Sequence, residues 1–244
     1  RRYYRKADAV VAVSRGAQKD ICKFLELPCE LVTSVYNPIA NQGLYTLSRD
    51  EPEHPWFERG SVPVILGIGR FVAQKDFPLL LDAFACVRRQ RKARLVLLGG
   101  DESSEEQRCV QQELLAQARR LGVENDFDLP GFVGNPFSFL SRASVFVLSS
   151  RYEGFGNVLV EAMLCGCPVV STDCHSGPAE ILENGKYGKL VPVGDAAGLA
   201  EAICSTLDTP QDEKVLRARG AEFSVENAVL HYGRILLGQE CRSG

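Results

Sequence analysis

The sequence predicts an α/β fold built on one Rossmann-like, doubly wound parallel sheet, and three observations predict it. Short apolar runs alternate with stretches whose apolar residues recur three or four positions apart, as strands and helices do when they alternate along a chain. The apolar runs are almost wholly Val, Ile and Leu, which is typical of strands covered by helices on both faces. Such units fill residues 60–207 without a break, which is enough for one such sheet.

Each element follows from this pattern in chain order. Residues 64–69 form an apolar strand that ends in glycine, and a helix is expected at 76–91. The apolar residues of that helix are spaced three and four apart: Phe77, Leu80, Leu81, Phe84 and Val87. The same criteria predict further strands at 94–98, 127–133, 145–149, 169–172 and 188–193. They predict further helices at 105–121, 136–142, 157–165, 179–183, 197–207 and 211–221.

The two ends of the chain differ from this central pattern. Residues 1–59 hold a strand at 9–13, a helix at 17–25 capped by Ser14, a strand at 30–35 and a loop-like stretch at 41–60. This is too little for a core of its own, so we expect the tail of a preceding Rossmann-like domain followed by a linker. The chain starts at Arg1 rather than methionine, which fits a piece of a longer protein. Residues 60–223 would form the main domain, and 224–244 a terminal segment with a helix at 225–237.

Composition and charge exclude several classes of protein. Apolar residues make up 45% and charged residues 24% of the chain, which is typical of a soluble globular protein, and no apolar run is long enough to cross a membrane. The net charge of −3 gives no basic surface for nucleic acid. Nine cysteines without a C-x-x-C pair fit free thiols in a reducing compartment. We therefore expect a cytoplasmic protein that does not bind nucleic acid.

The first candidate binding loop follows the strand at 64–69. Ligands of open parallel sheets bind beyond the carboxyl ends of the strands, so such loops are the places to search. Here Gly69 allows close approach to the backbone, and the cations Arg70 and Lys75 can converge on one anion such as a phosphate. The third glycine of a G-x-G-x-x-G fingerprint is missing. Read alone, the loop could equally be a tight turn with surface charges.

The second candidate loop follows the strand at 145–149 and opens the next helix. Gly154 and Gly156 free backbone N–H groups at the helix N-terminus, which is a natural anion site. Glu153 before the helix and Glu161 within it flank this site. Carboxylates do not bind phosphate, but they accept hydrogen bonds from sugar hydroxyls. The arrangement therefore suits a nucleotide sugar, with its ribose, diphosphate and hexose in a row, although two glutamates at this spacing can also mark a solvated helix face.

These motifs, in this order, resemble the family 4 glycosyltransferases, which are retaining enzymes of the GT-B fold. Glu153 and Glu161 match the family's E-x7-E motif, and Gly69-Arg70 with Lys75 is similar to its diphosphate clamp. The resemblance extends to the segments 131–136, 166–170 and 177–181, and it covers nearly the whole chain from residue 7 to 237. The family's N-terminal glycine-rich loop and catalytic-site histidine are absent, so the chain resembles the C-terminal, donor-binding half with a remnant of the N-terminal domain.

The resemblance implies a role for each matching residue. The catalytic residues would be Arg70 and Lys75, which neutralise the departing diphosphate, and Glu153, which contacts the donor hexose. Glu161 would bind the ribose hydroxyls and the backbone of Val133 would face the base. The remaining donor-binding residues would lie along the two loops: Gly69, Gly154, Phe155, Gly156, Asn157 and Val158. No metal and no cofactor is implied, because the nucleotide sugar is itself the substrate.

The resemblance also implies what the protein does. It would move a hexose or N-acetylhexosamine from a UDP-sugar, with a GDP-sugar left open, to a glycan or lipid-linked acceptor in the synthesis of surface polysaccharide or lipopolysaccharide. The acceptor, and any peripheral contact with the inner face of the cell membrane, would be bound through the missing domain. Two other functions stay open at this point: a non-catalytic nucleotide-sugar binding subunit, and another GT-B enzyme such as an epimerase or phosphorylase.

Overall fold

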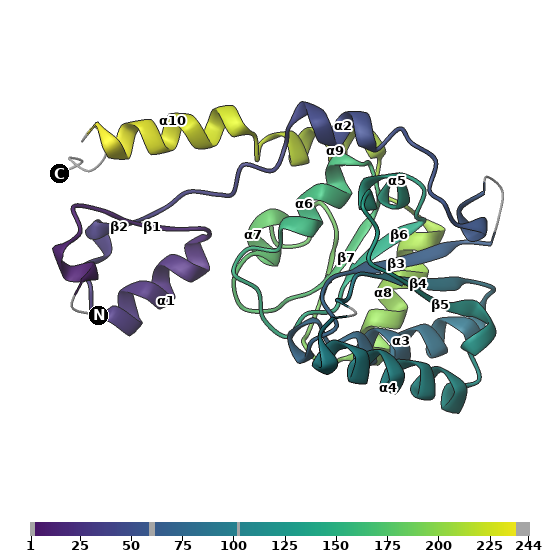
Figure 1. Ribbon diagram of the computed structural model, residues 1–244. Coiled ribbons are helices and arrows are strands. Elements are labelled where there is room, and N and C mark those ends of the chain that lie inside the picture. The colour runs from purple at the N-terminus through teal and green to yellow at the C-terminus, as the bar shows by residue number, and fades with distance from the viewer. Residues whose placement is uncertain (1–2, 59–61, 102, 238–244) are drawn as a thin grey trace.

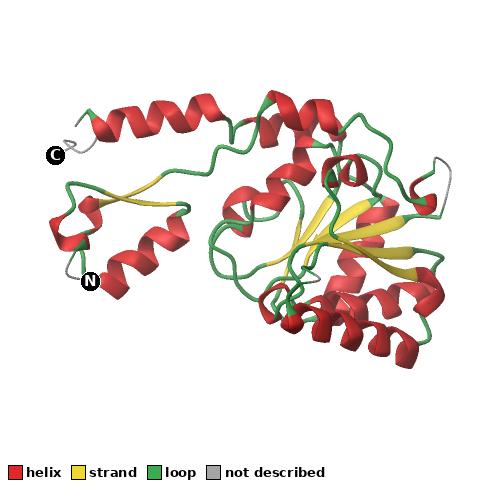
Figure 2. Ribbon diagram, viewed as in Figure 1, coloured by secondary structure: helices red, strands yellow, loops and turns green. Residues whose placement is uncertain are grey.

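The computed structural model describes residues 3–58, 62–101 and 103–237, and its centre is a six-stranded parallel sheet between two layers of helices (Figure 2). The strand order is β5-β4-β3-β6-β7-β8, so the chain winds outward from β3 in one direction and then from β6 in the other. The bounds of these strands are β3 Val64–Ile68, β4 Arg94–Leu98, β5 Phe127–Gly131, β6 Val145–Leu148, β7 Val169–Thr172 and β8 Lys189–Val191. The predicted doubly wound α/β fold is confirmed.

Alternation along the strands divides the core into two layers. Side chains of successive strand residues point to opposite faces of a sheet. Ile65 and Leu97 accordingly lie in one buried cluster, whereas Leu66 and Leu98 lie in the other. The first cluster includes side chains of α3 Phe77–Gln90, α4 Glu105–Leu121 and α8 Ala196–Asp208. The second includes side chains of α5 Pro136–Leu140, α6 Asn157–Leu164, α7 Pro178–Ile181 and α9 Glu213–Ala221.

The N-terminal segment forms a small unit beside the main domain (Figure 1). It consists of β1 Val10–Ala12, α1 Arg15–Leu25 and β2 Val32–Ser34, and the two strands pair in parallel in a separate sheet. The side chain of Ser14 accepts a hydrogen bond from the amide of Ala17, as its predicted capping role requires. The buried side chains that hold this unit together come from both strands, the helix and the following turn: Val10, Ala12, Cys22, Leu25, Leu27 and Val32.

The stretch at 41–60, expected to be a loop, contains a helix. This helix, α2 Gln42–Leu47, begins where the side chain of Asn41 accepts a hydrogen bond from the amide of Leu44. Leu44 is buried in the core layer that includes α5 and α6, so one cap and one apolar anchor are enough to order a six-residue helix. The prediction of a continuous loop was wrong. The predicted boundary between residues 59 and 60 lies outside the described residues.

The C-terminal helix, α10 Val225–Leu236, projects from the main domain on the same side as the N-terminal segment (Figure 1). Ser224 caps its first turn through the amide of Asn227. The amides of Ile39 and Ala40 both donate to the carbonyl of Phe223, so the linker and the start of α10 are joined. The helix predicted at 225–237 is confirmed, whereas residues 238–244 of the predicted terminal segment lie outside the described residues. Of the helices that the structure describes, none is long and apolar enough to cross a membrane.

Candidate functional site

A cleft of about 430 Å³ lies where the order of the strands reverses, between β3 and β6. Ligands of doubly wound sheets bind at this switch point, because the two neighbouring strand-to-helix loops separate there. Two of these loops line the cleft together with residues of the N-terminal segment: Val13, Asn37, Ile68, Gly69, Lys75, Glu153, Gly154, Phe155, Gly156, Asn157, Val158 and Glu161. All the predicted site residues except Arg70 and Val133 are therefore brought together here.

The N-terminus of α6 opens into this cleft without a side-chain cap. Gly156 precedes the helix with a φ of 98°, a conformation that favours glycine, and its position offers no side-chain cap to the first-turn amides. The first N–H groups of a helix have no partner within it, and the helix dipole adds positive potential at this end. Asn157 and Val158, the first two helical residues, line the cleft. The arrangement can receive an anion.

Lys75 and Glu153 form an ion pair across the cleft. The Lys75 Nζ lies 2.6 Å from the Glu153 Oε1, and the two side chains are only 15% and 9% exposed. The hydroxyl of Ser150 donates to the same carboxylate oxygen over 2.7 Å. The stem of Lys75 runs over Gly69, where an added Cβ would come within 3.0 Å of the lysine Cε. The sequence pattern placed these two charges in one cleft, but it did not predict that they bind each other.

Further contacts tie the two loops to one another. The Ser149 hydroxyl donates to the carbonyl of Lys75 over 2.7 Å, and the amide of Arg151 donates to the carbonyl of Gln74 over 2.8 Å. The Arg151 guanidinium also bonds the buried carboxylate of Asp76, with 2.8 Å between Nε and Oδ2. Lys75 and Glu153 are thus held by a scaffold that does not depend on their own ion pair.

Glu161 is a partly buried carboxylate on the cleft side of α6. Burial raises the pKa of its carboxyl above the ordinary value, and the nearby charge of Lys75 partly opposes that shift. Among the residues that the structure describes, its carboxylate has no hydrogen-bond donor. A ligand with hydroxyl groups would supply the missing donors.

The raised pKa of Glu161 predicts a stability effect with a definite sign. The folded chain favours the protonated carboxyl, so this contribution is fully present below the unfolded pKa of about 4.3 and is lost as the pH rises through the higher folded pKa. Glu161→Gln should therefore increase the free energy of unfolding at pH 7, and the gain should vanish at acidic pH. Urea unfolding of both proteins across this range measures it. A variant that is less stable than the parent at pH 7 would contradict this burial.

A second, apolar pocket of about 250 Å³ adjoins the cleft at Ile68 and Gly69. Arg70 and Val133 line it, with the strongly exposed ring of Phe132 at its side. Its walls come from the ends of β3, β4 and β5, so it continues the same edge of the sheet. A flat apolar ring of ligand size fits such walls. The predicted convergence of Arg70 and Lys75 on one anion stays a prediction, since the two side chains line different pockets here.

The N-terminal segment contributes to the cleft in a way that the sequence analysis missed. Val13 and Asn37 line it, and the Asn37 side-chain amide donates to Asn157 Oδ1 over 2.8 Å. The Ser14 hydroxyl donates to the carbonyl of Gly154 over 2.7 Å. The available signal was that both positions stand at or just beyond the end of a predicted strand, as the other cleft loops do.

Glu180, at the start of α7, anchors this N-terminal segment. Its carboxylate accepts the amides of Arg15 and Gly16 over 2.9 and 2.8 Å, which places a negative charge at the N-terminus of α1. It also accepts the phenol of Tyr36 over 3.1 Å, and the Tyr36 ring stacks on Phe155 with 5.2 Å between centroids. The N-terminal segment therefore rests directly on the loop that carries the open helix end.

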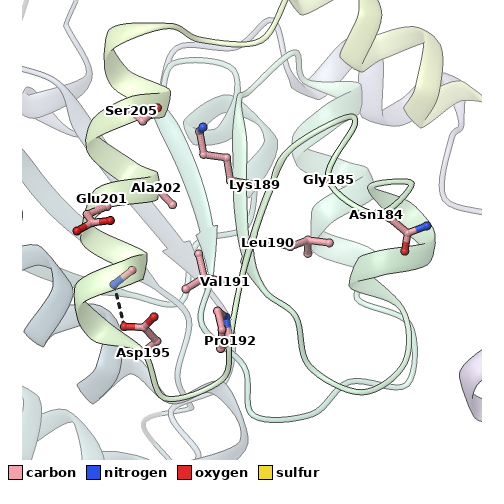
Figure 3. Close-up of a pocket in the computed structure, with 11 residues that line it drawn as sticks. Asn184, Gly185, Lys189, Leu190, Val191, Pro192, Asp195, Glu201, Ala202 and Ser205 are labelled. Atoms are coloured by element: carbon pink, nitrogen blue, oxygen red, sulfur yellow. Dashed lines mark hydrogen bonds between the residues drawn. The ribbon is translucent and has the colours of Figure 1, made fainter.

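Another cavity, separate from the cleft, lies beside the edge strand β8 (Figure 3). It measures about 570 Å³ and lies between β8 and α8. Asp195, the carboxylate at the start of α8, already accepts the amide of Gly198 in that helix (Figure 3). Glu201 lies about one turn beyond Gly198 in the same helix (Figure 3). Within the described ranges, no three His, Cys, Asp or Glu side chains come together as metal ligands would.

Comparison with protein families identifies the chain. The model described as "Glycosyl transferases group 1" matches residues 62–209, which is more than half of the chain and includes both cleft loops. The chain belongs to this family. The match fits a transferase better than the epimerase or phosphorylase left open by the sequence.

Two curated relatives of this group 1 glycosyl transferase are themselves named as glycosyltransferases. It is 30% identical over 217 residues to the N-acetylgalactosamine-N,N'-diacetylbacillosaminyl-diphospho-undecaprenol 4-alpha-N-acetylgalactosaminyltransferase of Campylobacter jejuni, covering 88% of this chain and 54% of the relative. It is 30% identical over 233 residues to the lipopolysaccharide core biosynthesis glycosyltransferase LpsE of Rhizobium meliloti, covering 95% of this chain and 62% of the relative. The chain thus spans between half and two thirds of these relatives.

A solved structure supports the same assignment. The group 1 glycosyl transferase is similar to HepE of Anabaena, crystallised in complex with UDP-glucose, with a TM-score of 0.78 and 26% identity. The similarity covers 95% of this chain and 64% of HepE. It includes the N-terminal segment as well as the main domain, since 95% coverage cannot be reached without both.

Proposed function

We propose that the chain is the donor-binding half of a retaining glycosyltransferase. The enzyme transfers a hexose or N-acetylhexosamine from a UDP-sugar to a glycan or lipid-linked acceptor in surface polysaccharide synthesis. One observation carries the proposal: the uncapped N-terminus of α6 opens, together with Lys75, Glu153 and Glu161, into the cleft at the switch point of the sheet. The acceptor binds through a preceding domain, and the curated relatives are long enough to contain such a domain.

The proposed donor lies along the cleft and its neighbouring pocket. Its diphosphate occupies the open amides of α6 beside Lys75, and its ribose hydroxyls donate hydrogen bonds to the carboxylate of Glu161. The base enters the apolar pocket at Val133, with Arg70 between base and diphosphate. The hexose then meets Glu153 on the other side of the diphosphate. The two pockets share Ile68 and Gly69, so one extended molecule spans both.

The proposed chemistry is stabilisation of the leaving diphosphate. As the glycosidic bond breaks, negative charge grows on the diphosphate, and the fixed amides and cations are ready to receive it; such preorganised charge is usually the largest catalytic contribution. Lys75, Arg70 and the helix end supply positive charge, so the proposal includes no metal and no cofactor. Retention follows if the acceptor attacks from the face that the diphosphate leaves, with the diphosphate accepting the acceptor's proton.

The proposed donor, acceptor and location in the cell are inferred from the similar proteins. HepE was crystallised with UDP-glucose, which favours a UDP-sugar. The Campylobacter relative is named for a diphospho-undecaprenol acceptor and the Rhizobium relative for lipopolysaccharide core biosynthesis, which favours a lipid-linked or surface glycan. A lipid-linked acceptor would bring the complete enzyme to the inner face of the cell membrane, with peripheral contact made by the preceding domain.

Calorimetric titration in EDTA with UDP, GDP, ADP and TDP tests the proposal. We expect UDP to bind in the micromolar to millimolar range and the other three to bind more weakly. Glu201→Gln, which alters the separate cavity beside β8, is the matched control and should bind UDP like the parent. If GDP binds more tightly than the other three nucleotides, the donor is a GDP-sugar and not a UDP-sugar. A folded chain that binds none of the four nucleotides would contradict the proposed donor site.

A further inference from the structure

The Lys75–Glu153 ion pair has a consequence for which molecules the cleft accepts. Lys75 is bonded to the Glu153 carboxylate, and the pair is nearly buried. The groups that face Glu153 are the Lys75 ammonium and the Ser150 hydroxyl. Cys174 lies nearby, and its burial, together with the Glu153 charge, raises the pKa of its thiol. Glu161, the other carboxylate of the cleft, feels the same lysine charge. The Lys75 ammonium group thus interacts with the carboxylates of both Glu153 and Glu161.

A diphosphate entering the cleft has to share or take this ammonium. The anion would also lie close to the Glu153 carboxylate, since both would contact Lys75. Like charges repel strongly where solvent screening is poor, and removing the cation partner leaves a nearly buried carboxylate uncompensated. Glu153 therefore opposes the binding of a free nucleoside diphosphate.

An intact nucleotide sugar compensates this cost. The hexose hydroxyls can donate hydrogen bonds to the Glu153 carboxylate after the diphosphate has drawn Lys75 away. Hydrogen bonds to a charged acceptor are stronger than those between neutral groups, so they offset the lost contact to Lys75. The glycosyl group also lowers the charge on the diphosphate, because it is bonded to an oxygen that is ionised in the free nucleoside diphosphate.

We infer that Glu153 is a specificity-determining residue that occupies Lys75 in the unliganded cleft, so that the cleft favours the nucleotide sugar over the free nucleoside diphosphate. The inference rests on the proposed function, because it requires the diphosphate to contact Lys75. In the reaction it favours release of the product, since transfer removes the hexose and returns Glu153 to Lys75. A role for the pair in folding alone predicts none of this selectivity.

Titration of the Glu153→Gln variant tests the inference. Glutamine keeps the shape and can still accept the Ser150 hydroxyl, but it frees the lysine charge. We expect the variant to bind UDP about tenfold more tightly than the parent, equivalent to about 1.4 kcal/mol. The ratio of UDP-sugar to UDP affinity should fall, measured with UDP-glucose, UDP-galactose and UDP-N-acetylglucosamine. Glu201→Gln is again the control and should change neither quantity.

The outcomes separate the inference from the proposed function. If the parent does not bind UDP, the proposed donor fails. If the parent binds UDP but Glu153→Gln binds it equally or more weakly, the inference is overturned while the donor site stands. Glu153→Asn, a smaller neutral replacement, gives a second reading should the glutamine variant fail to fold, as judged by thermal unfolding. Tighter UDP binding by either folded variant, with an unchanged control, supports the inference.

Discussion

Replacing Lys75 by methionine should weaken UDP binding by about 10- to 150-fold. The figure corresponds to the loss of one charged hydrogen bond to the diphosphate, about 1.5–3 kcal/mol. The same change should also destabilise the fold, because the Glu153 side chain is only 9% exposed and its carboxylate would lose its cation. Breaking a buried pair on one side costs about 3–5 kcal/mol. Calorimetry measures the first effect and urea unfolding the second.

The double variant Lys75→Met/Glu153→Gln separates these two effects. It removes both charges of the pair, so stability should return close to that of the parent, while UDP binding should stay weaker than that of Glu153→Gln alone. Lys186→Met, which removes an exposed lysine paired with Glu183, is the matched control and should leave UDP binding unchanged. UDP affinity in the double variant equal to that of Glu153→Gln alone would show that Lys75 does not contact the diphosphate.

Replacing Gly177 by alanine should disturb the donor loop through the backbone. Gly177 has a φ of 93°, and an added Cβ would lie 1.8 Å from the carbonyl oxygen of Phe155. Backbone strain and overpacking together are expected to cost about 2–5 kcal/mol. Since Phe155 lies between Gly154 and Gly156, displacement of its carbonyl moves the open end of α6, and UDP affinity should fall with stability.

Gly194→Ala is the matched control for this prediction. Gly194 also has a positive φ, of 84°, but an added Cβ would meet nothing within 4 Å. It should therefore cost only the conformational strain of about 1–2 kcal/mol and leave UDP affinity unchanged. Equal effects of the two substitutions on UDP binding would contradict the contact between Gly177 and the donor loop.

The sequence was most informative about the sheet and the positions of the loops. Neighbouring strand residues such as Ile65 and Leu66 point to opposite faces of the sheet, and both are apolar. A sheet covered by helices on both faces requires that pattern. Strand ends could be read from glycines and serines, so the cleft loops were found before their geometry was known. Boundaries were less exact: the strand expected to reach residue 133 ends at Gly131, where the backbone turns to a φ of 84°.

Side-chain pairing could not be read from the same pattern. Lys75 and Glu153 are 78 positions apart, and only the folded loops bring their charges to 2.6 Å. The support of the cleft by Glu180 depends likewise on the chain folding back, because the amides that it accepts lie 164 and 165 positions away. Local sequence gives the type of group at a strand end, whereas tertiary packing decides which groups meet.

The helix α2 was missed for a local reason. Asn41 and Gly43 are turn formers, and the residues that follow are charged and rich in proline, so the whole stretch reads as a loop. The same asparagine is a good helix cap, and the burial of Leu44 in the main core decides between the two structures. Such short helices depend on contacts that are distant in sequence.

A crystal structure of the chain with UDP is the measurement that tests the central claim most directly. The account predicts the diphosphate at the amides of Asn157 and Val158 beside Lys75, the ribose hydroxyls on Glu161, and the uracil in the apolar pocket at Val133. Lys75 should have moved from Glu153 toward the diphosphate. UDP bound elsewhere, such as in the cavity beside β8, with the Lys75–Glu153 pair unchanged, would contradict the account.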